Sequence, residues 1–274
     1  MNDETPPEQT PTRVLSYNVL YHLNRPDEYS WENRRDAVAE TIASQHPDIV
    51  CLQEVWRDQL TDLQERLPDY EWIGPPDGNE HTVIAYRPDR YTVVTEEFRW
   101  LSEPDADPGT PGWDGPYQKR FTFVTFRDTW TDTEFVVFSV HLHSEGAVAQ
   151  PEGMKLLRQT LTEVSSDEPA ILVGDYNVEP GSEVYELGRK SRDEFRDLVY
   201  ASDIAETVDG PEATFTSIDE DDASEDEDES NIDHALVTPD LTVERFETVV
   251  PESESEEFRP SDHRPIVVDV SFPS

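Results

Sequence analysis

The sequence has one cysteine, three lysines and no long apolar run among its 274 residues. The single cysteine, Cys51, excludes a disulfide within the chain, and its apolar neighbours in DIVCLQEV predict a small buried thiol. No apolar run approaches the roughly 18 residues that a membrane-spanning helix needs. The first residues, MNDETPPEQTP, lack the apolar core of a signal peptide, so we expect a cytoplasmic protein that does not engage a membrane.

Basic residues are scarce beside the acidic ones. The chain has 62 Asp plus Glu against 21 Lys plus Arg, a formal net charge of -41. Such a balance is typical of disordered chains, but six Trp, ten Tyr and eleven Phe supply the apolar surface of a folded core. The composition is similar to that of proteins from halophilic, archaeon-like sources. Such proteins work in concentrated salt, where the Debye length is about 3 Å at 1 M and the repulsion among carboxylates is largely screened. In that setting the net charge does not exclude a phosphate-bearing substrate.

One domain is expected over residues 12–274, and we expect it to act as a monomer. Residues 1–11 are polar and rich in proline, which predicts a disordered tail. The block DEDDASEDEDE, residues 219–229, is too charged to pack, so a solvated acidic loop is favoured over a metal site. The segment LSEPDADPGTPGWDGPYQ, residues 101–118, is rich in Pro, Gly and Asp and predicts a long ordered loop.

Apolar and alternating runs predict many strands and a few helices. The predicted strands are 12–19, 48–55, 71–74, 81–86, 91–100, 120–130, 134–142, 170–174, 213–217, 231–237, 241–250 and 265–272. One helix is expected from Trp31, capped by Ser30, to the break at His46-Pro47. Further helices are expected around 60–67, around 153–164 and within 182–200. This order fits sheet-on-sheet packing with helices outside.

Polar residues recur where these strands begin or end. They are Asn18 after VLSY, Glu54 after DIVCLQ, His141 after FVVFSV, Asp175 and Asn177 after ILVG, Asp233 in NIDHALV, and Asp262 with His263 before RPIVVDV. Each one alone is explained equally well as a turn or a cap. Their repetition favours a single cleft, because polar residues at the same ends of adjacent strands can converge.

The motifs SYNV, CLQEV, SVHLH, GDYN, IDHALV and SDHRP resemble, in this order, those of the endonuclease/exonuclease/phosphatase superfamily. That superfamily groups DNase-I-like nucleases, abasic-site endonucleases, deadenylases, sphingomyelinases and inositol phosphatases. The resemblance spans residues 12–272, and WLSEPDADPGTPGWDG resembles a further signature of a small bacterial and archaeal branch. It implies a four-layer α/β-sandwich, in which two packed mixed β-sheets are flanked by helices and hold the site at one end.

The resemblance also implies divalent-metal-dependent hydrolysis of a phosphoester by in-line attack of water. Such a reaction depends mainly on positioning and electrostatic stabilisation. Mg²⁺ prefers oxygen ligands, often one or two carboxylates with waters and substrate phosphate, and Mn²⁺ is an alternative. By the resemblance, Glu54 is the metal carboxylate, Asn18 assists it, and Asp262 is the second carboxylate.

The remaining motif residues are candidates for the chemistry itself. Asp175 can accept a proton from the attacking water or fix its direction. Asn177, two residues on, is expected on the same side of an extended segment, where it can donate to a phosphate oxygen. His263 is expected to touch the scissile phosphate, with Asp233 holding its other ring nitrogen.

His141 is a candidate donor to the phosphate or the leaving oxygen, and the alternation of HLH sends His143 to the same face, so their roles could be exchanged. Many relatives have Asp in place of His143 and, by the simplest count, Arg in place of Gln150. Arg120 in YQKRF matches an arginine of the nearest branch, and a salt bridge explains it equally well. Tyr117 could bind the substrate phosphate, although aromatic packing is the more common use.

The sequence leaves the substrate open among nucleic acid, a nucleotide, and an inositol or sugar phosphate. Basic residues are sparse, which favours a small phosphoester over a strand. A lipid head group is least expected, because no amphipathic insertion element is evident. The alternative from another functional class is a catalytically silent binding protein, against which the retention of Glu54, Asp175 and His263 argues.

Overall fold

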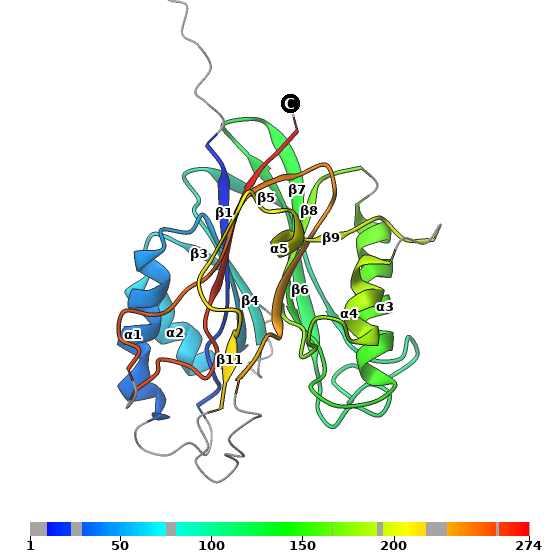
Figure 1. Ribbon diagram of the computed structural model, residues 1–274, viewed down its shortest axis with the longest axis horizontal. Coiled ribbons are helices and arrows are strands. Elements are labelled where there is room, and N and C mark those ends of the chain that lie inside the picture. Colours follow the sequence, from blue (N-terminus) through cyan, green and yellow to red (C-terminus); the bar gives the residue numbers. More distant parts are fainter. Residues whose placement is uncertain are drawn as a thin grey trace, which may run out of the picture.

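Two β-sheets pack face to face, and helices cover the outer face of each sheet (Figure 1). The structure is a computed structural model that describes residues 10–22, 29–74, 81–165, 167–190, 194–217, 229–255 and 258–273. The layers follow the order of helices, seven-stranded sheet, six-stranded sheet and helices. The predicted four-layer α/β-sandwich with two mixed sheets is therefore confirmed.

The seven-stranded sheet joins both ends of the described chain. Its order is β10 (Thr207–Asp209), β14 (Thr242–Thr248), β15 (Ile266–Ser271), β1 (Thr12–Asn18), β2 (Ile49–Val55), β4 (His81–Tyr86) and β3 (Glu71–Ile73). Strands β1 and β2 are parallel, with Asn18 opposite Gln53. Strand β15 runs antiparallel to β1, with Ile266 opposite Ser16. Residues that end β1 and β2 and residues that precede β15 therefore meet at the same end of the sheet.

The six-stranded sheet brings a second set of strand ends to this place. Its order is β5 (Tyr91–Trp100), β6 (Arg120–Asp128), β7 (Thr133–His141), β8 (Ala170–Asp175), β13 (Asp233–Val237) and β9 (Val199–Tyr200). Strands β7 and β8 are parallel with His141 opposite Asp175, and β13 is antiparallel to β8 with Asp233 opposite Asp175. Three predicted site residues thus stand in one row across three neighbouring strands.

Strands buried on both faces explain the continuous apolar runs of the sequence. In β1, Val14 lies between the sheets, whereas Leu15 packs under the helices α1 (Trp31–Ser44) and α2 (Arg57–Arg66). In β8, Ile171 lies between the sheets, whereas Leu172 faces α3 (Ala149–Val164) and α4 (Glu183–Arg189). Three apolar layers therefore hold the four structural layers together and leave the strand ends for polar side chains.

The predicted element boundaries agree with the structure except in places where tertiary contacts decide them. Ser30 occupies the N-cap position of α1, but its side chain makes no capping hydrogen bond, so its predicted capping role is wrong. Helix α3 begins before the expected residue 153, because the Asp114 carboxylate accepts hydrogen bonds from the N–H groups of Val148 and Ala149. The short elements β9, β10 and α5 (Ala201–Ile204) were not predicted.

One of the two predicted loops, residues 101–118, lies within the described residues. Residues 101–118 contain no helix or strand, and the loop is held partly by the Glu103 carboxylate, which accepts from the N–H of Trp113. The acidic block lies outside the described residues except for Glu229, which pairs with Thr216 in the small sheet of β11 (Phe215–Thr216) and β12 (Glu229–Ser230). The predicted tail lies outside them except for residues 10–11, whose carbonyls accept hydrogen bonds from Arg90. Within the described ranges, no helix has the length and apolarity that a membrane crossing needs.

Candidate active site

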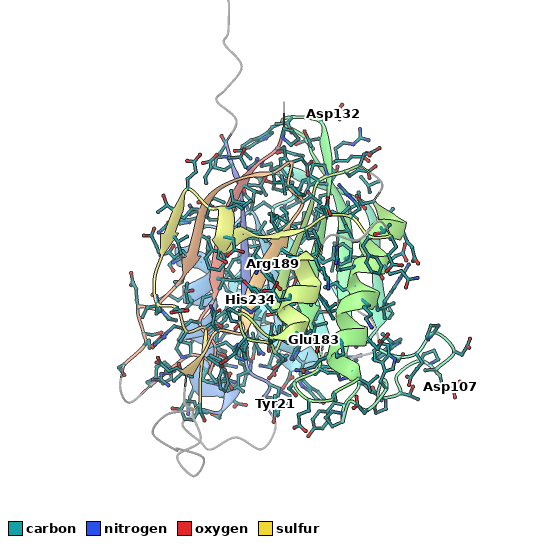
Figure 2. All side chains as sticks on the ribbon, turned by 45° about the vertical axis from the view of Figure 1, so that its right-hand side comes forward. Tyr21, Asp107, Asp132, Glu183, Arg189 and His234 are labelled. Carbon is teal, nitrogen blue, oxygen red and sulfur yellow. The ribbon has the colours of Figure 1, made fainter. Side chains whose placement is uncertain are left out.

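The predicted polar residues meet at one end of the two sheets. Asn18 and Asp175 end their strands, while Asp233 begins β13 and His263 lies just before β15. Figure 2 marks this end by Tyr21, whose N–H donates to a carboxylate of the site, and the opposite end by Asp132 in the turn between β6 and β7. The expectation that these strand ends converge is confirmed.

Asp175 lies at the centre of the site and is 2 % exposed. Its Oδ2 accepts a hydrogen bond of 3.0 Å from Nδ2 of Asn18, and its Oδ1 accepts one of 2.9 Å from the N–H of Asn177. The Nε2 atoms of His141 and His263 lie 3.4 and 3.8 Å from Oδ2. Burial raises the pKa of Asp175 to about 7, against the opposing effect of the His263 charge, so this carboxyl group can exchange a proton near neutral pH.

His263 is held by a buried carboxylate on its other side. Its Nδ1 lies 2.7 Å from Oδ2 of Asp233, and the ring of Phe215 packs edge-on against it. Burial alone would lower the pKa of His263, but the charges of Asp233 and Asp175 outweigh burial and raise it to about 10. The ring is therefore an imidazolium whose Nε2 faces the central carboxylate. The Asp233 contact that the sequence predicted is present.

Lys119 contacts His141 and was not predicted as a site residue. Its Nζ lies 2.7 Å from Nε2 of His141. Burial lowers the pKa of His141 well below its usual value, and the charge of Lys119 lowers it further, so this ring is neutral. The signal that could have found Lys119 is its place as one of three lysines, directly before the strand that pairs with β7.

The two histidines of HLH have different partners. His141 ends β7 beside Asp175, whereas His143 lies beyond the strand with Nε2 3.1 Å from the carbonyl of Leu101. A Cβ atom added at Gly115 would lie 2.4 Å from Nδ1 of His143, so the loop 101–118 packs directly on this ring. The predicted alternation stops with the strand, and His143 fastens the loop.

Asn177 does not continue an extended segment, and that expectation is wrong. Strand β8 ends at Asp175, and Asn177 has a left-handed φ of 52°. Its Nδ2 donates to the carbonyl of Leu142 at 3.0 Å, and its own carbonyl accepts from Nε2 of Gln150 at 3.0 Å. The amide nitrogen carries two hydrogens, and the bond to Leu142 uses one of them. The second hydrogen could bond to a phosphate oxygen, so that predicted contact stays a prediction.

Glu54 also adopts an uncommon backbone conformation. Its φ is 61°, and the pairing of β2 with β4 shifts register between Leu52 and Val55. Such a bulge redirects a side chain out of the regular pleat. One carboxylate oxygen of Glu54 accepts a hydrogen bond of 3.0 Å from the N–H of Tyr21, directly beyond the end of β1. Non-glycine residues in the left-handed region cluster at functional sites.

The donor set on this side consists of oxygens, which fits a hard divalent cation. It comprises the carboxylates of Glu54 and Asp262 and the Oδ1 of Asn18, which also accepts from the N–H of Leu20 at 3.1 Å. Within the ranges that the structure describes, no three or more His, Cys, Asp or Glu side chains are grouped closely enough to hold an ion by themselves. Mg²⁺ is commonly bound by one or two carboxylates plus water and phosphate, a mode that this set fits.

Arg34 fixes the backbone around the ends of β1 and β15 and was not predicted. It is fully buried, and Nη1 donates to the carbonyls of Val19 and Pro260 at 2.9 and 2.7 Å. Nearby, the Ser261 hydroxyl donates to the carbonyl of Asn18 at 2.7 Å. These bonds join two segments that are far apart in sequence, and no local pattern distinguishes Arg34 from a surface arginine.

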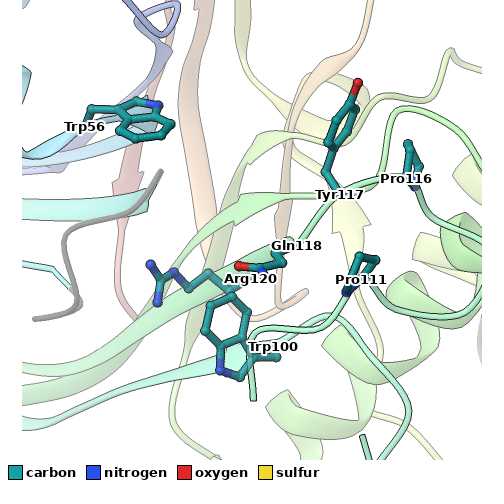
Figure 3. Close-up of a pocket in the computed structure, with 7 residues that line it drawn as sticks. All are labelled: Trp56, Trp100, Pro111, Pro116, Tyr117, Gln118 and Arg120. Atoms are coloured by element: carbon teal, nitrogen blue, oxygen red, sulfur yellow. The ribbon is translucent and has the colours of Figure 1, made fainter. Parts of the chain in front are cut away.

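Arg120 and Tyr117 line a pocket of about 430 Å³ (Figure 3). The guanidinium carbon of Arg120 lies 4.5 Å from the ring centre of Trp100 and 5.5 Å from that of Phe98, and the residue is 3 % exposed. The guanidinium therefore stacks on two rings, and the salt bridge considered from the sequence stays a prediction. Tyr117 is 64 % exposed, and the two roles considered for its ring stay predictions.

The fold and the site together define an α/β-sandwich protein with a buried acid, amide and histidine centre at one end. The model of the Endonuclease/Exonuclease/phosphatase family matches residues 15–263, and the chain belongs to this family. Members of the family are hydrolases that act on phosphoester bonds, and they generally use divalent metals.

Several proteins resemble this chain. The endonuclease/exonuclease/phosphatase from Bacteroides vulgatus is 29% identical, with 96% of this chain and 99% of that chain covered and a TM-score of 0.85. The mannosyl-6-phosphatase Bt3783 of Bacteroides thetaiotaomicron is 28% identical, with 95% and 100% covered and a TM-score of 0.81. Nocturnin of Drosophila melanogaster is 26% identical in an alignment of 209 residues, with 66% of this chain but only 31% of that protein covered.

Proposed function

We propose that the protein hydrolyses a phosphoester bond by in-line attack of water, with Mg²⁺ or Mn²⁺ as its cofactor. The observation that carries this proposal is the buried Asp175 carboxylate, which Asn18 fixes by a hydrogen bond of 3.0 Å and which faces His141 and His263. A carboxylate held in this way can orient a water and accept its proton. Membership of a phosphoester hydrolase family supports the same reaction.

In this proposal the cationic side chains stabilise the charge that develops on the phosphate oxygens. The imidazolium of His263 is oriented by Asp233, and the ammonium of Lys119 lies beside His141. Preorganised donors in a water-excluded site are worth more than the same groups in water. The neutral ring of His141 lies between the cation and Asp175, and the ring nitrogen that keeps its proton can donate to a phosphate or leaving oxygen.

Glu54, Asn18 and Asp262 would hold the metal ion. A bound Mg²⁺ or Mn²⁺ supplies positive charge beside the phosphate and helps to orient the substrate. The strained conformation of Glu54 and the hydrogen bond from Tyr21 supply the orientation of its carboxylate before substrate binds.

The proposal is tested by the hydrolysis of bis-p-nitrophenyl phosphate and a phosphomonoester panel in concentrated KCl with Mg²⁺. Glu54→Gln and His263→Ala should each lower kcat by about 100-fold or more. Glu65→Gln, the same change on the exposed surface of α2, is the matched control and should leave kcat unchanged. Chelation of the metal should abolish turnover and Mg²⁺ should restore it. Variants as active as the wild type would remove the site assignment.

A catalytically silent binding protein of the same fold is the alternative function. It predicts that no phosphoester in the panel is turned over. Calorimetry distinguishes the two, because the enzyme proposal requires Mg²⁺ binding that Glu54→Gln weakens. Absence of both turnover and Mg²⁺ binding would support the alternative.

The proposal extends to the setting in which the protein works. The net charge of -41 supports a monomer in a cytoplasm rich in salt, as in a halophilic source. We expect the free energy of unfolding and kcat to rise with the KCl concentration until the repulsion among carboxylates is screened. Unfolding and activity measured over a series of KCl concentrations test this expectation. A maximum of both in dilute buffer would contradict this part.

A further inference from the structure

The pocket that Arg120 lines has an aromatic wall, and we call it the aromatic pocket. It carries the rings of Trp56, Trp100 and Tyr117 and the polar side chains of Gln118 and Arg120, and two prolines complete the lining. Figure 3 shows Trp56 on one side and Tyr117 on the other, with Arg120 and Trp100 below them in the view. Its rings come from both sheets, since Trp56 follows β2 and Trp100 ends β5.

The aromatic pocket adjoins the candidate active site because the same chain segments form both. Trp56 lies two residues after Glu54, on the proposed metal side. On the other side, Arg120 follows Lys119, whose Nζ contacts His141. A ligand with its phosphate at the catalytic centre therefore has the aromatic pocket as one adjoining place for the rest of the molecule.

The lining favours a flat, electron-rich group attached to an anion. Arg120 lies under the ring of Trp100 at 4.5 Å, which fixes that ring and adds positive charge to the wall. Among the described residues that line the pocket none is acidic, although the chain has 62 Asp and Glu. Tyr117 is 64 % exposed, so its ring has a face available for a ligand.

We propose that the aromatic pocket binds the nucleobase of a small nucleotide substrate by stacking, while the phosphate of that substrate lies at Asp175. The inference rests on the function proposed above and specifies the substrate class of the same site. Bases stack on aromatic rings and on guanidinium planes, and the amide of Gln118 can pair with a base edge.

A sugar ring fits this lining less well than a base. A hexose presents hydroxyl groups around its whole rim, and each needs a hydrogen-bond partner when it is buried. The polar side chains in the wall are few, with Gln118 and Arg120 the principal ones. A base instead presents two π faces and a short polar edge, which three aromatic rings and one amide can satisfy.

The size of the aromatic pocket favours a mononucleotide or dinucleotide over a strand. Its volume of about 430 Å³ is near the lower end of the range for small-molecule pockets, about 300–1,000 Å³. Strand-binding proteins instead extend a basic groove with successive stacking rings. The pocket therefore defines one base position beside one phosphate.

Calorimetry with adenosine 5′-monophosphate, ribose 5-phosphate and glucose 6-phosphate tests the proposal. The titrations use the full chain with Mg²⁺ and the substitution Asp175→Asn, which prevents hydrolysis of the ligand during the measurement. Ribose 5-phosphate differs from the nucleotide only by the base, and the nucleotide should bind at least about tenfold more tightly than either sugar phosphate. Trp56→Ala and Tyr117→Ala should each remove most of that preference. Trp130→Ala, on a 61 % exposed ring in the distant turn between β6 and β7, should leave it unchanged.

Equal affinities for the three ligands, or a preference for glucose 6-phosphate, would overturn the proposal. A nucleotide preference that survives both Trp56→Ala and Tyr117→Ala would also overturn it, because the base would then lie elsewhere. If Trp56→Ala does not fold, the exposed Tyr117 still provides the test. The hydrolysis of methyl p-nitrophenyl phosphate by the wild type is the separate readout of the proposed function, since this ester has no base or sugar.

Discussion

Nε2 of His141 lies 2.7 Å from Nζ of Lys119 and 3.4 Å from Oδ2 of Asp175. Three neighbouring strands produce this row, because Lys119 precedes β6, His141 ends β7 and Asp175 ends β8. A cation, a neutral ring and a carboxyl group of raised pKa are therefore in contact at the end of one sheet.

Replacement of Lys119 by Met tests the cationic end of this row. We expect kcat for phosphoester hydrolysis to fall by about 100-fold, since one preorganised donor to the phosphate is lost. Lys155→Met removes a surface lysine that pairs with Glu152 on α3, and its kcat should match the wild type. Steady-state kinetics of both variants decide the question, and a Lys119→Met enzyme within twofold of the wild type would exclude a catalytic role.

His141→Ala and His143→Ala should fail in different ways. His141→Ala should lose activity, whereas His143→Ala should keep most of it and lower the free energy of unfolding by about 1–3 kcal/mol, because the buried carbonyl of Leu101 loses its partner. Urea unfolding and kcat are measured for both proteins. Full stability with lost activity in His143→Ala would instead place that ring at the phosphate.

Asn177 allows backbone and side-chain roles to be separated. Asn177 has a φ of 52°, which glycine adopts without strain, so Asn177→Gly keeps the turn. The free energy of unfolding of Asn177→Ala should be about 1 kcal/mol lower than that of Asn177→Gly. Both variants lack the amide, so both should lose kcat by a similar factor if that amide binds a phosphate oxygen. Recovery of wild-type kcat in Asn177→Gly alone would show that only the turn matters.

His234 should make stability depend on pH. Burial lowers its pKa from the usual value, and its Nε2 lies 2.8 Å from the carbonyl of Val178. As the pH falls, the ring therefore becomes protonated in the unfolded chain before it does so in the folded protein. The contribution of His234 to the free energy of unfolding is complete above about pH 6.5 and is lost as the pH falls below that value.

His234→Gln keeps a donor for Val178 and removes the titration. Between about pH 7.5 and 5.5 the wild type should lose stability more steeply than this variant, by at most about 1.4 kcal/mol per pH unit. Urea unfolding at each pH gives the two slopes. Parallel slopes would mean that the ring takes up its proton at the same pH in the folded and the unfolded chain.

The strands of the fold could be predicted because each is a local pattern. An apolar run such as ILVG before Asp175 indicates a buried strand whatever its partner is, and a polar residue after it marks the end. The elements β9 and β10 span two and three residues, which is too short for a periodic signal, and only pairing with β13 and β14 defines them.

The errors arose where a contact between distant segments overrides a local rule. The turn after β8 takes Asn177 out of the expected row, and the bond from His143 to Leu101 in the loop 101–118 has no signal in the sequence. Arg34 donates to the carbonyls of Val19, Leu20, Tyr29 and Pro260, although its neighbours in sequence suggest only a helix surface.

The sequence by itself determined the order of strands and helices and the polar residue types that end them, because both depend on neighbours along the chain. Only the tertiary structure decided that His141 and not His143 faces Asp175, that Lys119 joins them, and that the aromatic pocket lies beside them. These relationships depend on the pairing of β6, β7 and β8 and on side-chain packing between two sheets, which are properties of residues far apart in the chain.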